Sequence, residues 1–126
     1  MYETGLQMEM ISRHRLTGAS SQEGAEHSHN YLVEVIVRGH ELGEAGYLVD
    51  IDALRTALGA VLDTYRDTCL NELEDFAGTS PTLENLARAI WGRITVGLEA
   101  PQVDSMMVKV WESREAWASY ERGRTK

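Results

Sequence analysis

The feature that most constrains the fold is a long alternating run from His27 to Gly39, with the sequence H-S-H-N-Y-L-V-E-V-I-V-R-G. Successive side chains of a β-strand point to opposite faces. One face of this run would therefore carry His27, His29, Tyr31, Val33, Val35 and Val37. The β-branched residues favour a strand, and a glycine closes the run. The pattern predicts a strand with two histidines at the start of its apolar face.

Further strands are predicted on both sides of this run. The segment Leu6 to Leu16 alternates in part, so that Met8, Met10, Ser12 and His14 would share a face. The residues between, 17–26, are rich in Gly, Ser and Glu and indicate a loop. After Gly39, H-E-L-G-E-A-G suggests a hairpin turn, with Tyr47 to Asp50 as the returning strand. A last strand is expected from Ser105 to Glu112.

Two helices are predicted between these strands. The first starts near Asp50 or Asp52 and runs to about Leu70, with an apolar stripe of Leu54, Leu58, Val61, Leu62 and Tyr65. The second starts with Ser80 as cap and Pro81 at the first position, and it ends at Gly97 and Pro101. Its stripe is Leu83, Leu86, Ala87, Ile90, Trp91 and Ile94. The order β-β-β-α-α-β predicts an α+β fold, an antiparallel sheet with helices packed on one face.

Length and charge narrow the class of protein. The 126 residues suffice for a single domain spanning 1–126, and the formal net charge of -8 argues against nucleic acid and anionic membranes as partners. No apolar run is long enough to cross a membrane, and the first residues do not resemble a secretion signal. The single cysteine, Cys69, excludes an internal disulfide. We therefore expect a cytoplasmic protein.

Three of the four histidines could form one site. His27 and His29 project the same way from a strand, and pairing with the strand that carries His14 would bring three imidazoles together. Three neutral histidines with one open position are a catalytic zinc arrangement. The alternative is a polar surface patch, because H-x-H also occurs on strands by chance. His40 is expected to be exposed in the turn.

Five segments, in order, resemble motifs of the 6-pyruvoyl-tetrahydropterin synthase family, which includes the bacterial 6-carboxy-tetrahydropterin synthases. H-S-H-N-Y resembles the family's H-G-H-N-Y, and H-R-L is similar to its first-histidine segment. The other three are G-Y-L-V-D-I-D-A-L, S-P-T-L-E-N-L-A and V-K-V-W-E-S. Their order and spacing extend the resemblance over nearly the whole chain.

The resemblance implies a T-fold, an antiparallel four-stranded sheet with two helices on one side. It implies trimers that close their sheets into a barrel, and a hexamer as a dimer of trimers. By position, His14, His27 and His29 match the family's zinc ligands. Glu112 matches the glutamate that holds the pterin, and Thr82 matches a threonine near the same pocket. Helix capping is the alternative role for Thr82.

The sequence departs from the family at its catalytic residues. The resemblance places a catalytic cysteine four residues before the first histidine of the H-x-H motif, and this chain has Glu23 there. Arg66 and Asp67 stand where the family has an Asp-His pair, and no histidine follows His40. Acid–base groups contribute about 10²- to 10⁴-fold to such reactions. We therefore expect the usual synthase reaction to be very weak or missing.

Three functions remain open from the sequence. The chain could bind a pterin-like ligand with altered or lost chemistry. It could instead be an active, aldolase-like enzyme that cleaves the pterin side chain with Glu23, or less favourably Glu26, as the base; such a carboxylate would need a raised pKa. It could also be a structural or regulatory oligomer with a relict pocket.

Overall fold

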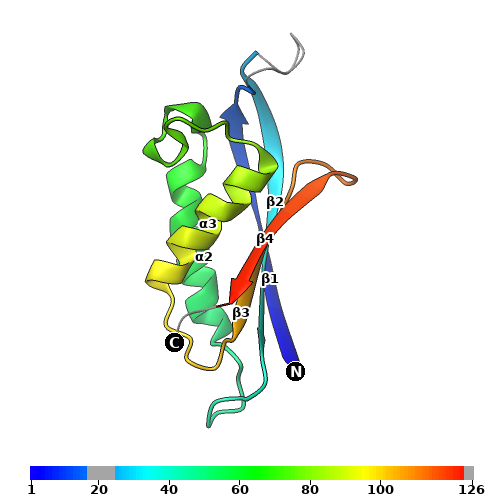
Figure 1. Cartoon of the computed structure of the whole chain (residues 1–126), viewed down its shortest axis with the longest axis vertical. Helices are drawn as coiled ribbons and strands as arrows, with labels where there is room; N and C mark the ends of the chain where they lie inside the picture. The colour runs from blue at the N-terminus through cyan, green and yellow to red at the C-terminus, as the bar shows by residue number, and fades with distance from the viewer. Residues whose placement is uncertain (17–24, 124–126) are drawn as a thin grey trace.

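The computed structural model describes residues 1–16 and 25–123. Four strands form one antiparallel sheet in the order β1-β2-β3-β4. Their bounds are Tyr2–His14, His27–Gly39, Ser105–Trp111 and Trp117–Gly123. Helices α2 (Ile51–Tyr65) and α3 (Leu83–Gly97) lie together on one face of the sheet (Figure 1). The expected α+β fold, a T-fold with two helices on one face of a four-stranded antiparallel sheet, is confirmed.

The pairing of β1 with β2 sets the position of the histidines. The two strands align so that His14 lies opposite His27 and Ser12 lies opposite His29. The predicted alternation holds in both strands, because the residues that face the helices are buried or half-buried, including Met10, Tyr31 and Val33. Three histidine side chains thus emerge on the helix-covered face, at the end of the sheet where β1 finishes and β2 begins.

Both helices bury the predicted stripes, except that Leu83 is only half-buried. Those of α2 are Leu54, Leu58, Val61, Leu62 and Tyr65, and those of α3 are Leu86, Ala87, Ile90, Trp91 and Ile94. The predicted ends differ. Helix α2 stops at Tyr65, and the chain continues through two short 3-10 turns, η1 (Leu70–Glu72) and η2 (Glu74–Phe76). Helix α3 begins at Leu83, because Thr82 and not Ser80 caps it. None of the helices in the described ranges combines the length and apolarity needed to cross a bilayer.

One strand prediction was wrong, and one strand was not predicted. Residues Tyr47 to Asp50 form no strand; they lie in a loop in which Leu48 and Val49 are buried while Tyr47 is exposed. The fourth strand was missed altogether: β4 follows β3 through a tight connection. The element order is therefore β-β-α-α-β-β, with the helices between two hairpins.

The outer edge of β1 is covered over part of its length. Asp67 donates its N–H to the carbonyl of Ile11, and Arg13 donates to the carbonyl of Thr68. The side chain of Asn71 continues this pairing by bonding to the backbone N–H and C=O of Arg15. Residues 67–71 thus cover the C-terminal third of this edge. Within the described ranges no strand pairs with the outer edge of β1, the edge away from β2, from Tyr2 to Met10.

Candidate metal and ligand site

The three predicted imidazoles converge. One nitrogen of each of His14, His27 and His29 lies within 4.8 Å of the others. Their ring centroids are 4.5 to 5.1 Å apart, and the rings meet edge to face. His14 is 1% exposed, whereas the other two are half-buried. The arrangement is a nitrogen cluster with a closed inner side and an accessible outer side, as an open-position metal site requires.

Backbone carbonyls orient two of the rings. The Nδ1 of His14 lies 3.0 Å from the carbonyl oxygen of Pro81, and the Nδ1 of His27 lies 2.8 Å from that of Ala25. A carbonyl oxygen only accepts, so each Nδ1 carries the hydrogen and each Nε2 keeps its lone pair. These two Nε2 atoms are 2.9 Å apart. Two lone pairs at that distance repel unless a cation lies between them, so this pair of nitrogens is suited to bind a metal ion.

The electrostatics of the inner histidine favour its neutral form. Burial lowers the pKa of His14 below its ordinary value, the bond to Pro81 opposes this shift, and the neighbouring His27 and His29 lower the pKa again. A metal ligand must be a neutral imidazole. Tyr31 lies behind the ring, with its hydroxyl 3.3 Å from the Nδ1 of His14. Burial, then the nearby Glu112, raises the pKa of Tyr31 well above its usual range, so it stays a neutral phenol.

Glu112 lies beside the cluster. It follows directly after β3, and its Oε2 is 3.9 Å from the Nε2 of His29. The backbone N–H of Glu112 donates to the carbonyl of Ala116, which fixes the residue at the base of the β3–β4 connection. The side chain is 33% exposed, so an incoming molecule can reach it. The structure therefore brings together the three histidines and Glu112, as the resemblance implied.

Thr82 is close to the cluster but already has a structural role. Its hydroxyl accepts the N–H of Asn85 at 3.2 Å and caps α3. The preceding residue, Pro81, contacts His14. The hydroxyl hydrogen of Thr82 is not used in this cap, so the residue can still donate to a ligand.

The candidate base, Glu23, lies outside the described residues. Glu26 is described, and it lies 3.6 Å from both Arg13 and Arg15 in exposed ion pairs. Cys69 would lie in the first predicted helix, which was expected to run to about Leu70. It lies instead in the segment that covers β1, 3.6 Å from Arg15. Burial, followed by a hydrogen bond to Glu26, raises the pKa of the thiol, which indicates a structural cysteine.

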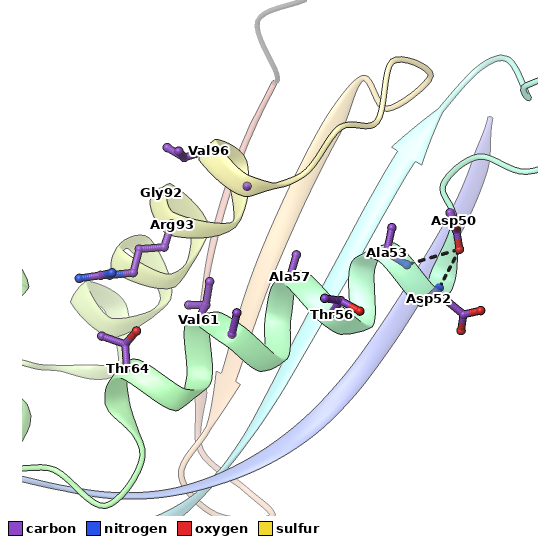
Figure 2. A pocket seen from close by; sticks show the side chains of 12 residues that line it. Asp50, Asp52, Ala53, Thr56, Ala57, Val61, Thr64, Gly92, Arg93 and Val96 are labelled. Carbon is purple, nitrogen blue, oxygen red and sulfur yellow. Dashed lines mark hydrogen bonds between the residues drawn. The ribbon is translucent and has the colours of Figure 1, made fainter.

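A separate groove runs between α2 and α3. Its volume is about 960 Å³, and Figure 2 shows Asp50 and Asp52 at one end and Thr64 and Arg93 at the other. Small residues such as Ala53, Ala57 and Gly92 line the groove, and none of the four histidines does. The groove offers room but no convergent reactive groups, so the histidine cluster is the better candidate for chemistry.

Comparison with known proteins identifies the family. The family model for 6-pyruvoyl tetrahydropterin synthase matches residues 6–123. The chain belongs to this family. It is 35% identical over 96 residues to the 6-pyruvoyl tetrahydrobiopterin synthase of Drosophila melanogaster, a match that covers 75% of this chain and 56% of that protein. It is 33% identical over 98 residues to the 6-carboxy-5,6,7,8-tetrahydropterin synthase of Bacillus subtilis, covering 75% of this chain and 64% of that protein.

The chain thus spans less than two thirds of the length of both relatives.

Solved structures of the 6-pyruvoyl tetrahydropterin synthase family share the fold over nearly the whole length of this chain. The Caenorhabditis elegans protein has a TM-score of 0.81 at 23% identity, covering 96% of this chain and 95% of that one. A Plasmodium vivax protein, solved as an alanine variant of a catalytic glutamate, has a TM-score of 0.78 at 17% identity, covering 98% and 100%.

The groups that orient the histidine rings were not predicted from the sequence. The carbonyls of Pro81 and Ala25 orient the rings, but a backbone carbonyl leaves no mark in a sequence pattern. The alternation placed Tyr31 on the same face as His27 and His29, but the contact of its hydroxyl with His14 was not predicted.

Proposed function

We propose that this 6-pyruvoyl tetrahydropterin synthase family member binds a pterin-like ligand beside a metal held by His14, His27 and His29, and that it does not carry out the usual synthase reaction efficiently. The observation that carries the proposal is the position of Glu112, 3.9 Å from an imidazole of the histidine cluster. Recognition and metal-binding groups thus share one accessible site.

The donor set supports a zinc ion. Imidazole nitrogens suit zinc, and the Nε2 atoms of His14 and His27 point toward each other with their hydrogens on the opposite nitrogens. When bound, such an ion would polarise an oxygen of the ligand. The protein's own contribution is to orient the rings of His14 and His27 through backbone carbonyls, and to shield the inner side from water by burying His14.

Glu112 supports recognition of the pterin ring. A carboxylate can accept two parallel N–H bonds from an aminopyrimidinone edge, and such charge-assisted bonds are the strong ones. Thr82 would add a hydroxyl donor at the same site. We therefore expect Glu112→Gln to weaken binding of an oxidised pterin about ten-fold or more, since a hydrogen bond to a charged group contributes about 1.5–3 kcal/mol.

The test is a calorimetric titration with neopterin, combined with metal analysis of the purified protein. Glu115→Gln is the matched control, because Glu115 is exposed in the same β3–β4 connection. The proposal expects wild-type and control to bind alike and Glu112→Gln to bind weakly. Absence of both pterin and metal binding in the wild type would contradict it and favour a structural or regulatory oligomer.

The lost synthase activity is tested separately. The chain has no histidine after His40, and Glu23 stands at the position of the family's cysteine. We expect negligible turnover of dihydroneopterin triphosphate, because the proton-transfer set is incomplete. Rapid turnover by pure protein would refute this half of the proposal.

A second candidate is an active pterin side-chain lyase with Glu23 as base. The Plasmodium vivax structure supports this alternative, since a glutamate is described as catalytic in that protein. Under this alternative Glu23→Gln would abolish turnover of a dihydroneopterin substrate while leaving pterin affinity intact. Equal rates for the variant and the wild type would exclude it.

We also propose that the chain forms a ring-shaped oligomer, a hexamer built from two trimers. Among the described residues nothing pairs with two edges of the sheet, the outer edge of β1 before Ile11 and the outer edge of β4. Pairing β1 of one copy with β4 of the next would satisfy both edges and close the sheet into a barrel.

A further inference from the structure

The bond between His14 and Pro81 joins two segments far apart in the chain. It is buried, 3.0 Å long, and spans 67 residues. The matching bond of His27 goes to Ala25, only two residues away on the approach to the same strand. His27 is therefore oriented locally, whereas the orientation of His14 depends on where the start of α3 lies.

Pro81 cannot fix its own position through its backbone nitrogen, because proline has no N–H. Its neighbours do so. The N–H of Thr82 donates to the carbonyl of Ser80 at 2.9 Å, closing a tight turn around Pro81. The side-chain amide of Asn85 donates to the same carbonyl at 2.8 Å.

The hydroxyl of Thr82 completes this arrangement by accepting the N–H of Asn85 at 3.2 Å. Hydrogen bonds thus tie the residues on both sides of Pro81 to the first turn of α3. The proline carbonyl that meets His14 is held between them.

We propose that Asn85, together with Thr82, is a positioning residue for the histidine cluster: it holds the Pro81 carbonyl on the Nδ1 of His14 and so keeps Nε2 available for a metal. This inference rests on the proposed metal binding. It assigns the first turn of α3 a role in metal affinity in addition to its possible contact with the ligand.

The decisive variant is Asn85→Asp. Aspartate has nearly the same shape, and a negative charge in the first turn of a helix is favourable, so α3 should remain folded. Aspartate has no N–H to donate to the carbonyl of Ser80, and that bond is lost. Thr82→Ala removes the hydrogen bond from the N–H of Asn85 to the Thr82 hydroxyl, and Thr82→Ser retains it.

A matched control is Asp50→Ala. Asp50 caps α2 by accepting the N–H groups of Asp52 and Ala53, at 2.9 and 3.4 Å. Its loss weakens a helix start of the same kind, but the two bonds that Asp50 accepts lie within the first turn of α2 and do not involve the histidine cluster. Any general effect of a lost cap would therefore appear in this control as well.

Two readouts test the proposal. The first is the ¹⁵N chemical shifts of the His14 ring in metal-free protein, which report whether Nδ1 or Nε2 carries the hydrogen. The second is zinc affinity, measured by competition with a chromogenic chelator. We expect Asn85→Asp and Thr82→Ala to mix the His14 tautomers and to weaken zinc binding about ten-fold, the lower end of the range for groups that orient metal ligands.

Asp50→Ala and Thr82→Ser should match the wild type in both readouts. Unchanged tautomer and unchanged affinity in Asn85→Asp would overturn the inference. A wild-type protein that shows the Nδ1–H tautomer, loses it in Asn85→Asp, and still binds no zinc would uphold the positioning role while refuting the proposed metal function.

Discussion

Asp75, in η2, accepts three hydrogen bonds on its carboxylate. Its carboxylate receives the hydroxyl of Tyr65 at 2.6 Å and two N–H groups of Arg93, at 2.7 and 2.6 Å. These bonds, from Arg93 first, lower the pKa of Asp75 to about 2. The carboxylate is only 15% exposed, so it is partly shielded from water. This single side chain ties η2 to both helices.

The low pKa predicts how stability changes with pH. Because the pKa is lower in the folded protein than in the unfolded chain, the ionised carboxylate stabilises the fold above about pH 4, and this stabilisation is lost as the pH falls toward 2. We expect Asp75→Asn to lower the free energy of unfolding at pH 7 by on the order of 1 to 2 kcal/mol, a value reduced for the solvent exposure of Arg93. The deficit should shrink between pH 4 and pH 2.

Urea unfolding at pH 7, 5 and 3 measures this difference. Asp63→Asn is the control, because Asp63 is 75% exposed in its ion pair with Arg66 and should have almost no effect. A deficit for Asp75→Asn that stays constant with pH would show that packing, and not charge, is responsible.

Ser80 offers a second prediction for a single residue. Its hydroxyl oxygen is buried and has no hydrogen-bond partner among the described residues. A buried polar group without a partner destabilises a fold by about 1–3 kcal/mol. We therefore expect Ser80→Ala to leave the melting temperature unchanged or to raise it. A clear fall in melting temperature would mean that the hydroxyl has a partner, such as a bound water.

Among the elements, the end of β2 is closely packed at Gly39. A Cβ added to Gly39 would lie 2.6 Å from the Cδ1 of Leu48 and would collide with the carbonyl oxygen of Gln102. Backbone cannot move aside as a flexible side chain can. Gly39→Ala should therefore destabilise the protein by about 1–3 kcal/mol, the usual range for overpacking.

Gly92 is the matched control, at which the same substitution should have the opposite effect on stability. It lies inside α3, and a Cβ there would meet nothing within 4 Å. Gly92→Ala should stabilise the protein by about 0.5–1 kcal/mol, because alanine loses less conformational freedom in a helix. Thermal melts of the two variants should shift in opposite directions; shifts of the same sign would contradict this account of both sites.

The same elements show what the sequence could and could not predict. Buried stripes in α2, α3, β1 and β2 were predictable because a regular period repeats over many residues. Tyr47 to Asp50 were predicted as a returning strand because the glycines before them suggest a hairpin turn, yet Leu48 and Val49 are buried within a loop, and Leu48 packs against Gly39. Strand β4 was missed because its pattern is weak: Ala118 and Tyr120 face inward among mostly polar residues.

The candidate site likewise has parts that the sequence could predict and parts that it could not. The three histidines were predictable because two share a strand and register brings the third opposite them. That Thr82 caps α3 is a local contact, and capping was the alternative role that the sequence offered for it. That Pro81 orients His14 depends on a contact between residues 67 apart in the chain, which no local pattern encodes.

For the whole molecule, the free edge of β1 predicts how assembly can be blocked. Ile11 and Arg13 direct their backbone groups away from β2, so the alternation places those of Gln7 outward as well. Gln7→Pro removes an outward N–H without breaking the pairing with β2, and proline is tolerated at an edge. We expect this variant to remain folded but to lose the oligomer.

Light scattering coupled to size exclusion measures the mass. The wild type should have the mass of six 14.1 kDa subunits, and Gln7→Pro a smaller mass with an unchanged circular dichroism spectrum. Gln7→Thr, which keeps the N–H and favours a strand, is the control. A hexamer that survives Gln7→Pro would exclude β1 as the joining edge.

Residues 67–71, which cover the C-terminal part of the outer edge of β1, also limit where a strand of another copy can pair with β1. An added strand must stop before Ile11, because the backbone there is already bonded within the chain. A slip of one residue would turn every side chain of the added strand to the wrong face. The covered stretch thus acts as a steric end point that restricts the available alignments and denies the sheet a continuous template for fibril growth.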